Sequence, residues 1–571
     1  MEKIKKLKKL FNNFNLDGYI VPKNDEFFSE YVSKDKDNLK YITNFTGSYG
    51  FALMLKKKNY LFVDGRYTNQ AEIEAGKLFK IITLPKKFPF DLIKKKNLKI
   101  GFDPRLHTHN NLNRLFKKKV KLLPILDNLI DKVKLKKKLS TQKKYFILGR
   151  DGIGKNVKNK INIYYKYLKK NKKDLIFISA PENVSWVLNI RGRDSEFSPI
   201  ANAYLIIDKN KKIFLFLDLK KISKKFRKKF KFLKILDINN LDIFLKNINN
   251  KKILVDINSC SIFYENILKQ GNEVKKETDL TYLLKAIKTS KEILNTRKTH
   301  LIDGIALTRF LLWIKNNYKR KKISEISAQE KLLSFRRKNK NFNNPSFPTI
   351  SGSGPNGAII HYRANKKSNR ILRKGDIYLI DSGGQYNYGT TDVTRTISLG
   401  NHNQRIKKIF TMVLKGHIAV SSFNISGKTI GSDIDRVARK PLNSINLDYP
   451  HGTGHGVGYF LNVHEGPQSL TRGNKVVLKE GMIVSNEPGY YEKNKFGIRI
   501  ENLIVVQRKK AKLYFENLTL APIDTNLIDK NLLNSKEKNW INNYHKNIFD
   551  KFKGYFKNNE LKELQNLCSN I

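Results

Sequence analysis

Acidic and histidine side chains gather in five short segments between residues 359 and 502, each flanked by apolar or glycine-rich sequence. These segments are Ile359–Tyr362, Asp376–Arg395, His451–Pro467, Ser485–Tyr491 and Gly497–Asn502. Carboxylates and imidazoles in such a set can bind metal ions or transfer protons. Because a lone buried carboxylate is costly unless it is paired or binds a metal, acids beside apolar strands predict a metal site.

Strand patterns predict how these side chains are brought together. Ile377–Ile380 predicts a strand that ends at Asp381, and Val393–Ile397 predicts one that begins after Asp392. The glycines between them permit a hairpin that brings the two aspartates together.

Two further strands carry the other acids. Ile483–Glu487 predicts a strand that ends in an acid and is closed by Pro488. In Gly497–Asn502, the alternation of a strand places Arg499 and Glu501 on the face opposite the neighbouring isoleucines.

The five segments together resemble the pita-bread metallopeptidases, a family that includes methionine aminopeptidase, prolidase, creatinase and aminopeptidase P. The strings His451–Val457, Val463–Pro467 and Glu487–Tyr491 are similar to the aminopeptidase P (Xaa-Pro aminopeptidase) branch. This resemblance implies a site of two divalent metal ions held by Asp381, Asp392, His455, Glu487 and Glu501. It also implies that Asp392 and Glu501 bridge the metals.

The same resemblance implies hydrolysis of the N-terminal Xaa-Pro bond of peptides by a hydroxide that the two metals share. Glu487 is the expected general base, and Arg499 is expected to orient a neighbouring acid. His361, His451 and His464 match family histidines that bind substrate, stabilise the tetrahedral intermediate or move protons. An oxygen-rich ligand set favours Mn²⁺, although Zn²⁺ and Co²⁺ can compete for it.

Two glycine and histidine motifs elsewhere in this region do not support other chemistries. Gly352, Gly354 and Gly357 match a dinucleotide-binding pattern, but a strand rather than a helix is expected over 358–362. His464-Glu465 begins like a zinc-protease motif, but Gly466-Pro467 breaks the helix which that motif requires. We therefore expect neither a Rossmann site nor a zincin.

The rest of the chain predicts an α/β fold in three parts. Residues 1–146 and 147–285 alternate helix and strand patterns, and the second part reads as a diverged repeat of the first. Residues 286–571 form the expected pita-bread domain, with a basic helical extension from about 514. A long helix is predicted over 286–318, and a capping box predicts that another helix starts at Ser327.

Length and motif content separate the family alternatives. With 571 residues, the chain is similar to the long aminopeptidases P, which have two related N-terminal domains, whereas prolidases have one. A prolidase that cleaves only dipeptides remains the enzymatic alternative. The other alternative is a catalytically silent member that binds nucleic acid or other partners.

Charge bears on that last alternative. The formal net charge is +62, but the chain has 90 Lys and only 22 Arg, and codon bias toward AT-rich codons enriches Lys without functional selection. Residues 351–505 hold 21 basic and 11 acidic residues, a net charge of +10. We therefore do not expect nucleic acid as a partner, and the family resemblance implies peptides with proline at the second position instead.

The remaining features bear on location and assembly. No apolar run approaches the ~18 residues that span a bilayer, and the basic segment 1–14 reads as a surface helix rather than a transit peptide. Two distant cysteines, Cys260 and Cys568, favour a reducing compartment. We therefore expect a cytoplasmic protein with no membrane partner, and the resemblance implies a homodimer.

Overall fold

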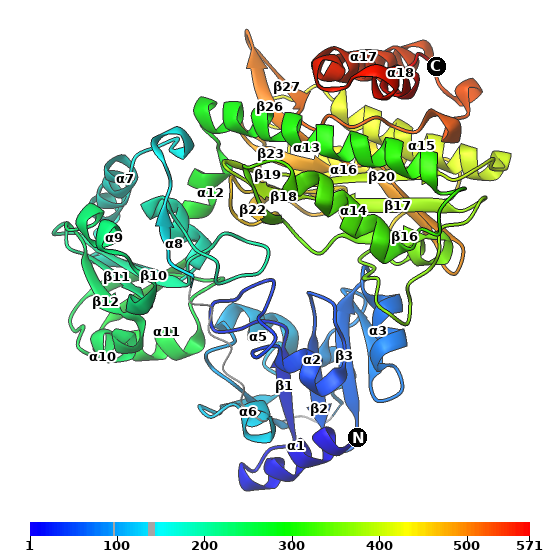
Figure 1. The fold of residues 1–571 in the computed structure, drawn as a ribbon. Helices are drawn as coiled ribbons and strands as arrows, with labels where there is room; N and C mark the ends of the chain where they lie inside the picture. The colour runs from blue at the N-terminus through cyan, green and yellow to red at the C-terminus, as the bar shows by residue number, and fades with distance from the viewer. Residues whose placement is uncertain (95–96, 135–142) are drawn as a thin grey trace. The chain divides into compact units, whose positions relative to one another are not determined.

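A computed structural model describes residues 1–94, 97–134 and 143–571, and it divides into two compact units. We name Met1–Tyr282 the N-terminal unit and Leu283–Ile571 the C-terminal unit (Figure 1). Helices and strands mix throughout both units, which confirms the α/β prediction. Within the described ranges, no helix is long and apolar enough to cross a membrane.

The first half of the N-terminal unit is a six-stranded sheet covered on both faces. Its strands follow the order β4-β3-β2-β1-β5-β6. Their bounds are β1 Gly18–Pro22, β2 Phe51–Leu55, β3 Asn59–Asp64, β4 Lys80–Leu84, β5 Lys99–Phe102 and β6 Lys121–Pro124. The helices are α1 Glu2–Asn13, α2 Asn38–Thr43, α3 Thr68–Ala75, α4 Pro89–Leu92, α5 His109–Phe116 and α6 Leu129–Val133.

Alternation along these strands builds two cores. Tyr19 and Val21 of β1 pack with buried residues of α1, whereas Ile20 packs on the other face with residues of α5. Helix α1 buries Ile4, Leu7 and Phe11, the apolar residues of a basic segment, so the predicted surface helix is confirmed.

The second half of the N-terminal unit contains another six-stranded sheet, in the order β12-β11-β10-β8-β13-β14. Its strands are β8 Leu175–Ile178, β10 Ala203–Asp208, β11 Ile213–Leu217, β12 Lys234–Asp237, β13 Lys252–Asp256 and β14 Glu273–Glu277. A short ladder joins β7 Phe146–Ile147 to β9 Ile190–Arg191. The helices are α7 Val157–Lys170, α8 Pro181–Leu188, α9 Lys224–Lys229, α10 Leu241–Lys246 and α11 Ile262–Leu268.

The two sheets have the same topology. In each, the first strand pairs antiparallel with the second and parallel with the fifth, and both edge strands pair parallel with their neighbours. Asn44 ends α2 and Asn189 ends α8, both with left-handed backbone at φ 65° and 53°. The predicted repeat is therefore confirmed, and in each half an asparagine ends the helix that follows the first strand of the sheet.

The C-terminal unit combines long helices with several small antiparallel sheets. Its helices are α13 Ser290–Asn317, α14 Glu325–Arg337, α15 Gln404–Ser421, α16 Gly431–Asn443, α17 Ser535–Phe552 and α18 Asn558–Leu567, while α12 (Thr281–Ala286) leads into it. Three-stranded sheets have the orders β16-β17-β20 and β15-β18-β19, and a five-stranded sheet has the order β22-β21-β23-β26-β27. A hairpin pairs β24 with β25.

The strands of this unit are short, and several end at the segments singled out by sequence. They are β15 Phe342–Pro345, β16 Ile350–Ser353, β17 Ile377–Ser382, β18 Gly384–Tyr386, β19 Gly389–Thr390, β20 Val393–Ser398, β21 Gly454–Gly456, β22 Glu465–Leu470, β23 Ile483–Asn486, β24 Gly489–Glu492, β25 Phe496–Arg499, β26 Asn502–Lys509 and β27 Lys512–Asn517.

Three local predictions differ from the structure. The helix expected over 286–318 is interrupted before Ser290, because Thr289 caps α13 through a capping box with Glu292. The next helix begins at Glu325, capped by Ser324, so the start predicted at Ser327 is wrong by about one turn.

The third difference lies in the segment around His361. The strand expected over 358–362 is wrong, because Gly354–Ala358 forms the 3₁₀ helix η4 and a turn follows it. Glu325 explains this shape. Its buried carboxylate accepts hydrogen bonds from the Ser353 amide at 2.7 Å, the Asn356 amide group at 3.0 Å and the Tyr362 hydroxyl at 2.8 Å. The loop closes around that carboxylate rather than extending.

The C-terminal helices pack against the strands that carry the last acidic segment. Ile541, Tyr544 and Ile548 of α17 share a core with Ile498 and Ile500. Figure 1 shows α17 and α18, in red, next to α15. Trp540 stacks on Tyr544 with ring centroids 5.2 Å apart. Both residues therefore anchor the C-terminal extension.

Candidate metal centre

Each predicted metal ligand lies at the end or the edge of a strand in the C-terminal unit. Asp381 is on β17, Asp392 lies directly before β20, and Asp381 faces Thr394 in the antiparallel register of these two strands. The predicted hairpin thus brings the two aspartates together. Glu487 directly follows β23, and Glu501 lies between β25 and β26.

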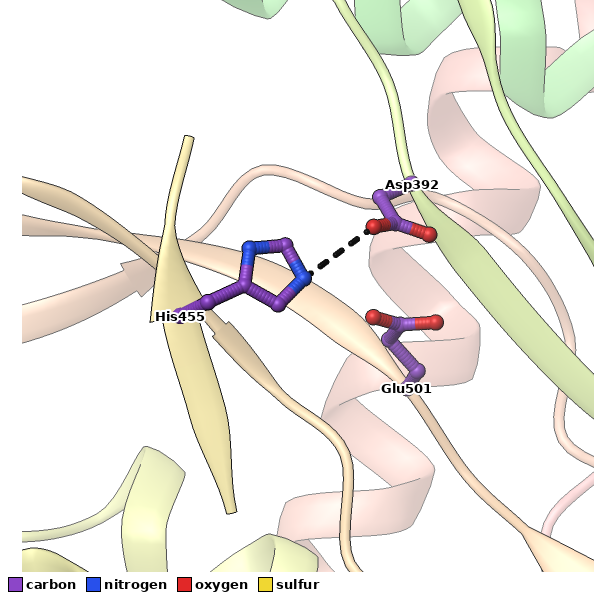
Figure 2. Close-up of side chains that lie close together, drawn as sticks. All are labelled: Asp392, His455 and Glu501. Carbon is purple, nitrogen blue, oxygen red and sulfur yellow. Dashed lines mark ion pairs between the residues drawn. The ribbon is translucent and has the colours of Figure 1, made fainter. Parts of the chain in front are cut away.

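Three of these side chains converge closely enough to share one cation. One ligand atom each from Asp392, His455 and Glu501 lies within 4.8 Å of the others. Figure 2 shows the His455 ring pointing between the two carboxylates. His455 Nε2 lies 3.4 Å from Asp392 Oδ2 and 3.5 Å from Glu487 Oε1. The structure therefore also brings Glu487 to this group.

Arg499 and Thr394 tie Asp381 to the same cluster. Arg499 Nη2 donates to Asp381 Oδ2 at 2.6 Å, and its Nε donates to Thr394 Oγ1 at 2.9 Å. The Thr394 hydroxyl in turn donates to Glu501 Oε2 at 2.8 Å. Arg499 and Glu501 thus face the cluster while Ile498 and Ile500 enter the core, as strand alternation predicts.

Burial makes this concentration of carboxylates costly. Burial and the negative charges of Asp381 and Glu487 raise the pKa of Asp392 well above its usual range. Burial and the charge of Asp392 raise the pKa of Glu501 in the same way. Burial also raises the pKa of Asp381, although Arg499 opposes the shift. These directions describe carboxylates that need a nearby positive charge to ionise.

Glu487 differs from the other three acids. Burial acts to raise the pKa of Glu487, but the neighbouring His455, His451 and Arg499 together outweigh it, so the pKa is lowered overall. The Ser485 hydroxyl donates to Glu487 Oε1 at 3.0 Å and also accepts from the His455 amide at 2.9 Å. Glu487 is therefore held as a carboxylate beside the other predicted ligands.

The donor set fits divalent cations. His455 Nδ1 lies 2.9 Å from the Gly456 carbonyl, so Nδ1 carries the proton and Nε2 turns its lone pair toward the carboxylates. Asp381 Oδ1 is buried and has no hydrogen-bond partner in the described part of the chain. Converging lone pairs of oxygen and imidazole nitrogen repel one another unless a cation lies between them.

A hydrogen-bonded chain connects His451 to this cluster. The His451 Nδ1–H donates to the Gly452 carbonyl at 2.7 Å, which leaves Nε2 to accept from Tyr491 Oη at 2.9 Å. Tyr491 Oη accepts from Arg499 Nη1 at 2.7 Å, so its own proton points to His451. Burial lowers the pKa of His451 to about 4, and the ring is therefore neutral near pH 7.

His464 and His361 occupy two different surroundings. The centroids of the His464 and His455 rings lie 4.4 Å apart, and the rings meet edge to face at an interplanar angle of 75°. His361 is half-buried in the turn after η4. A Cβ on Gly357 of η4 would lie 3.2 Å from the Gly497 amide nitrogen, so η4 packs against β25, the strand that carries Arg499.

Close backbone approaches explain the glycines around His455. A Cβ on Gly454 would lie 1.8 Å from the Ser485 carbonyl oxygen, and one on Gly456 would lie 2.1 Å from the Glu465 carbonyl oxygen. Real Cβ atoms do not approach so closely, so β21 fits between β22 and β23 only as glycine around His455.

A buried arginine joins the cluster to the C-terminal extension. Arg395 is 1% exposed and donates to the main-chain carbonyls of Glu501 at 2.7 Å and Ala521 at 2.7 Å. It also donates to the Tyr544 hydroxyl of α17 at 3.0 Å. Every one of these partners is uncharged, so Arg395 acts as a multiple hydrogen-bond donor rather than as half of an ion pair.

Sequence reasoning missed several polar residues of the site. The Thr394 hydroxyl donates to the predicted ligand Glu501, and the Ser485 hydroxyl donates to the predicted ligand Glu487. Arg395 donates to the main-chain carbonyl of Glu501. Tyr491 lay within a quoted motif but was given no role. The one available signal was position, because Thr394 and Arg395 lie only two and three residues after Asp392, on strand β20.

Comparison with known proteins places the chain in a family. Residues 295–508 match the model of metallopeptidase family M24, and 512–571 match the C-terminal region of peptidase_M24. Residues 3–133 and 136–292 each match a creatinase/prolidase N-terminal domain. The chain belongs to the M24 metallopeptidases, and it carries both N-terminal domains as well as the C-terminal region.

Relatives that match over the full length carry more specific names than the family models do. The chain is 36% identical over 600 residues to a probable Xaa-Pro aminopeptidase P of Laccaria bicolor, covering 100% of this chain and 93% of the relative. It is also 36% identical to Xaa-Pro aminopeptidase 1 of Dictyostelium discoideum, covering 96% and 92%.

Two solved structures are similar to this chain, one over its full length and one over part of it. An X-prolyl aminopeptidase from Caenorhabditis elegans, described as a cytosolic enzyme with a di-nuclear active site, superposes with a TM-score of 0.95 at 30% identity. It covers 100% of this chain and 99% of its own. A prolidase from Pyrococcus furiosus covers only 62% of this chain, with a TM-score of 0.51 at 25% identity.

Proposed function

We propose that the protein is an Xaa-Pro aminopeptidase that releases the N-terminal residue of peptides with proline at the second position. The observation that carries this proposal is the convergence of Asp392, His455 and Glu501 within 4.8 Å, in a chain with full-length Xaa-Pro aminopeptidase relatives. Prolidase is the weaker alternative, because the prolidase neighbour lacks a counterpart for more than a third of this chain.

The metal centre is assigned by the donor set. In this proposal Asp381, Asp392, His455, Glu487 and Glu501 hold two divalent cations, with Mn²⁺ favoured by four carboxylates and one imidazole. When bound, two such ions polarise a carbonyl and lower the pKa of water.

The chain's own residues supply the remaining chemistry. Glu487 has a pKa lowered chiefly by His455 and His451 and accepts a hydrogen bond from Ser485, so this carboxylate is placed to accept a proton. His464, His451 and His361 are assigned to bind substrate or to stabilise charge on the carbonyl oxygen. Arg499 orients Asp381 through its 2.6 Å bond. The Xaa-Pro bond has no N–H, which explains why a dedicated enzyme is needed.

Further parts of the proposal concern location and organisation. Cys260 and Cys568 are both buried free thiols, which supports a reducing, cytoplasmic location. We also propose a homodimer, the domain limits 1–146, 147–285 and 286–571, and no role in binding nucleic acid. A titration of nucleic acid at several salt concentrations tests that last point.

The direct test is turnover of Arg-Pro-Pro by metal-loaded and metal-stripped protein. We expect free arginine to be released, activity to vanish after chelation and activity to return with Mn²⁺. Metal analysis should give two ions per chain. Cleavage of the dipeptide Arg-Pro alone would favour prolidase, and no cleavage of either peptide would contradict the proposal.

Another prediction concerns the effect of His464 on turnover. The His464→Ala variant should fold and keep its metal content, because His464 is not among the proposed ligands. Its turnover should fall by about 100-fold or more, the usual effect of removing an acid–base or oxyanion group. His402→Ala, in the loop before α15, serves as control, and unchanged turnover of His464→Ala would remove this histidine from the mechanism.

A further inference from the structure

A second cluster of buried charges lies beside the metal centre, and the family resemblance gave it no role. Glu465 Oε1 lies 2.6 Å from Lys288 Nζ, and Glu465 Oε2 lies 3.1 Å from Lys285 Nζ. The three side chains are 1%, 0% and 3% exposed, respectively. Lys285 is on α12 and Lys288 is in the link between α12 and α13.

Both lysines of this cluster contact the same carboxylate, one ammonium group at each oxygen. Burial alone would raise the pKa of Glu465, but the charges of Lys285 and Lys288 lower it. Such a cluster is weak evidence for stability, because apolar side chains of similar volume often serve as well or better. An additional role explains why the charges are there.

The position of Glu465 suggests that role. Glu465 directly follows His464 and pairs with Gly456, the neighbour of His455, across the ladder of β21 and β22. Its Oε2 would lie 3.1 Å from a Cβ on Gly458, so the carboxylate also packs against the glycine-rich loop. One buried side chain therefore fixes the backbone next to both histidines.

We propose that Lys285 and Lys288 are positioning residues that act through Glu465 to hold the His464 ring edge-on to His455. Lys288 pairs with one carboxylate oxygen of Glu465 and Lys285 with the other. These two ion pairs fix the side-chain rotamer of Glu465 and the position of the first residue of β22. His464, which directly precedes that strand, is then held at a fixed angle to the His455 ring. This inference rests on the role proposed above for His464 in turnover.

A double-mutant cycle tests the proposal in the full-length, metal-loaded protein. We expect Lys288→Met to lower kcat on Arg-Pro-Pro by about 10- to 100-fold, the range for supporting residues, with little change in KM and in metal content. In the His464→Ala background, the same Lys288→Met change should have almost no further effect. Lys298→Met, an exposed lysine on α13, is the matched control.

Other variants keep the test decisive if Lys288→Met does not fold. Lys285→Met and Glu465→Gln each remove one charge and should show the same dependence on His464. Additive losses of kcat in the double mutants would overturn the proposal. So would a fall in stability with kcat unchanged, because the cluster would then only support folding.

A spectroscopic measurement separates this inference from the proposed function. The chain has 10 His, so ring resonances can be followed after labelling with ¹⁵N-histidine, with His464 assigned from His464→Ala. Lys288→Met should shift the His464 signals and Lys298→Met should not. Unshifted His464 signals would overturn the positioning role even if no peptide is cleaved, whereas shifted signals without turnover would contradict only the proposed function.

Discussion

Asp392→Asn is expected to abolish release of the N-terminal residue from an Xaa-Pro peptide. The substitution keeps the shape of the side chain but removes the negative charge of a carboxylate that, in our proposal, would help to hold the divalent cations. Loss of several kcal/mol of charge stabilisation corresponds to about three orders of magnitude in kcat. The measurement is turnover of Arg-Pro-Pro at saturating Mn²⁺, together with the metal content of the purified variant.

Thermal unfolding gives a second readout that does not depend on turnover. Without metal, Asp392→Asn should unfold at the same temperature as the wild type or higher, because it removes one of several mutually repelling buried carboxylates. With Mn²⁺, the wild type should gain stability by binding and the variant should gain much less. The exposed Asp550→Asn is the control, and wild-type-like turnover by Asp392→Asn would refute the metal assignment.

Arg395→Ala is expected to have the largest effect on stability. It removes the donor for the carbonyls of Glu501 and Ala521 and for the Tyr544 hydroxyl, and all of these acceptors are buried. Each buried group left without a partner costs about 1–3 kcal/mol. We therefore expect a loss of about 4 kcal/mol or more, seen as a lower unfolding midpoint or as insoluble protein.

Tyr544→Phe separates the hydrogen bond from the packing. It keeps the ring that stacks on Trp540 and should cost about 1–2 kcal/mol. Arg508→Ala, in an exposed pair with Glu480, should cost at most about 1 kcal/mol. An unfolding midpoint of Arg395→Ala no lower than that of Arg508→Ala would show that the hydrogen bonds of Arg395 to Glu501 and the C-terminal extension do not stabilise the fold.

Much of the fold was predictable because its signals are local. The apolar run Ile377–Ile380 and the β-branched residues of Val393–Ile397 predict two strands, and the register that places Asp381 opposite Thr394 follows once they pair. The repeat was detectable because each half has the same strand order and a similar asparagine cap. The full-length relatives confirm the family resemblance drawn from the motifs.

What could not be predicted depends on side chains far apart in sequence. Lys288 and Glu465 are 177 residues apart, and two lysines in a chain with 90 Lys carry no signal of burial. The loop at His361 reads as a strand because Ile359 and Ile360 are β-branched. The carboxylate of Glu325, on another helix, decides its shape instead. Arg395 gives no hint of its partners in α17.

The close backbone contacts at Gly454 and Gly456 also restrict which substitutions this chain can accumulate during evolution. Among described non-glycine residues with left-handed backbone, eight are Asn and five are Lys, so coding bias has entered many turns that glycine could occupy. The same bias cannot replace Gly454 or Gly456 on either side of His455, because a Cβ at either position would overlap a carbonyl oxygen. The demands of folding alone therefore keep this stretch recognisable, even where no peptidase activity is under selection.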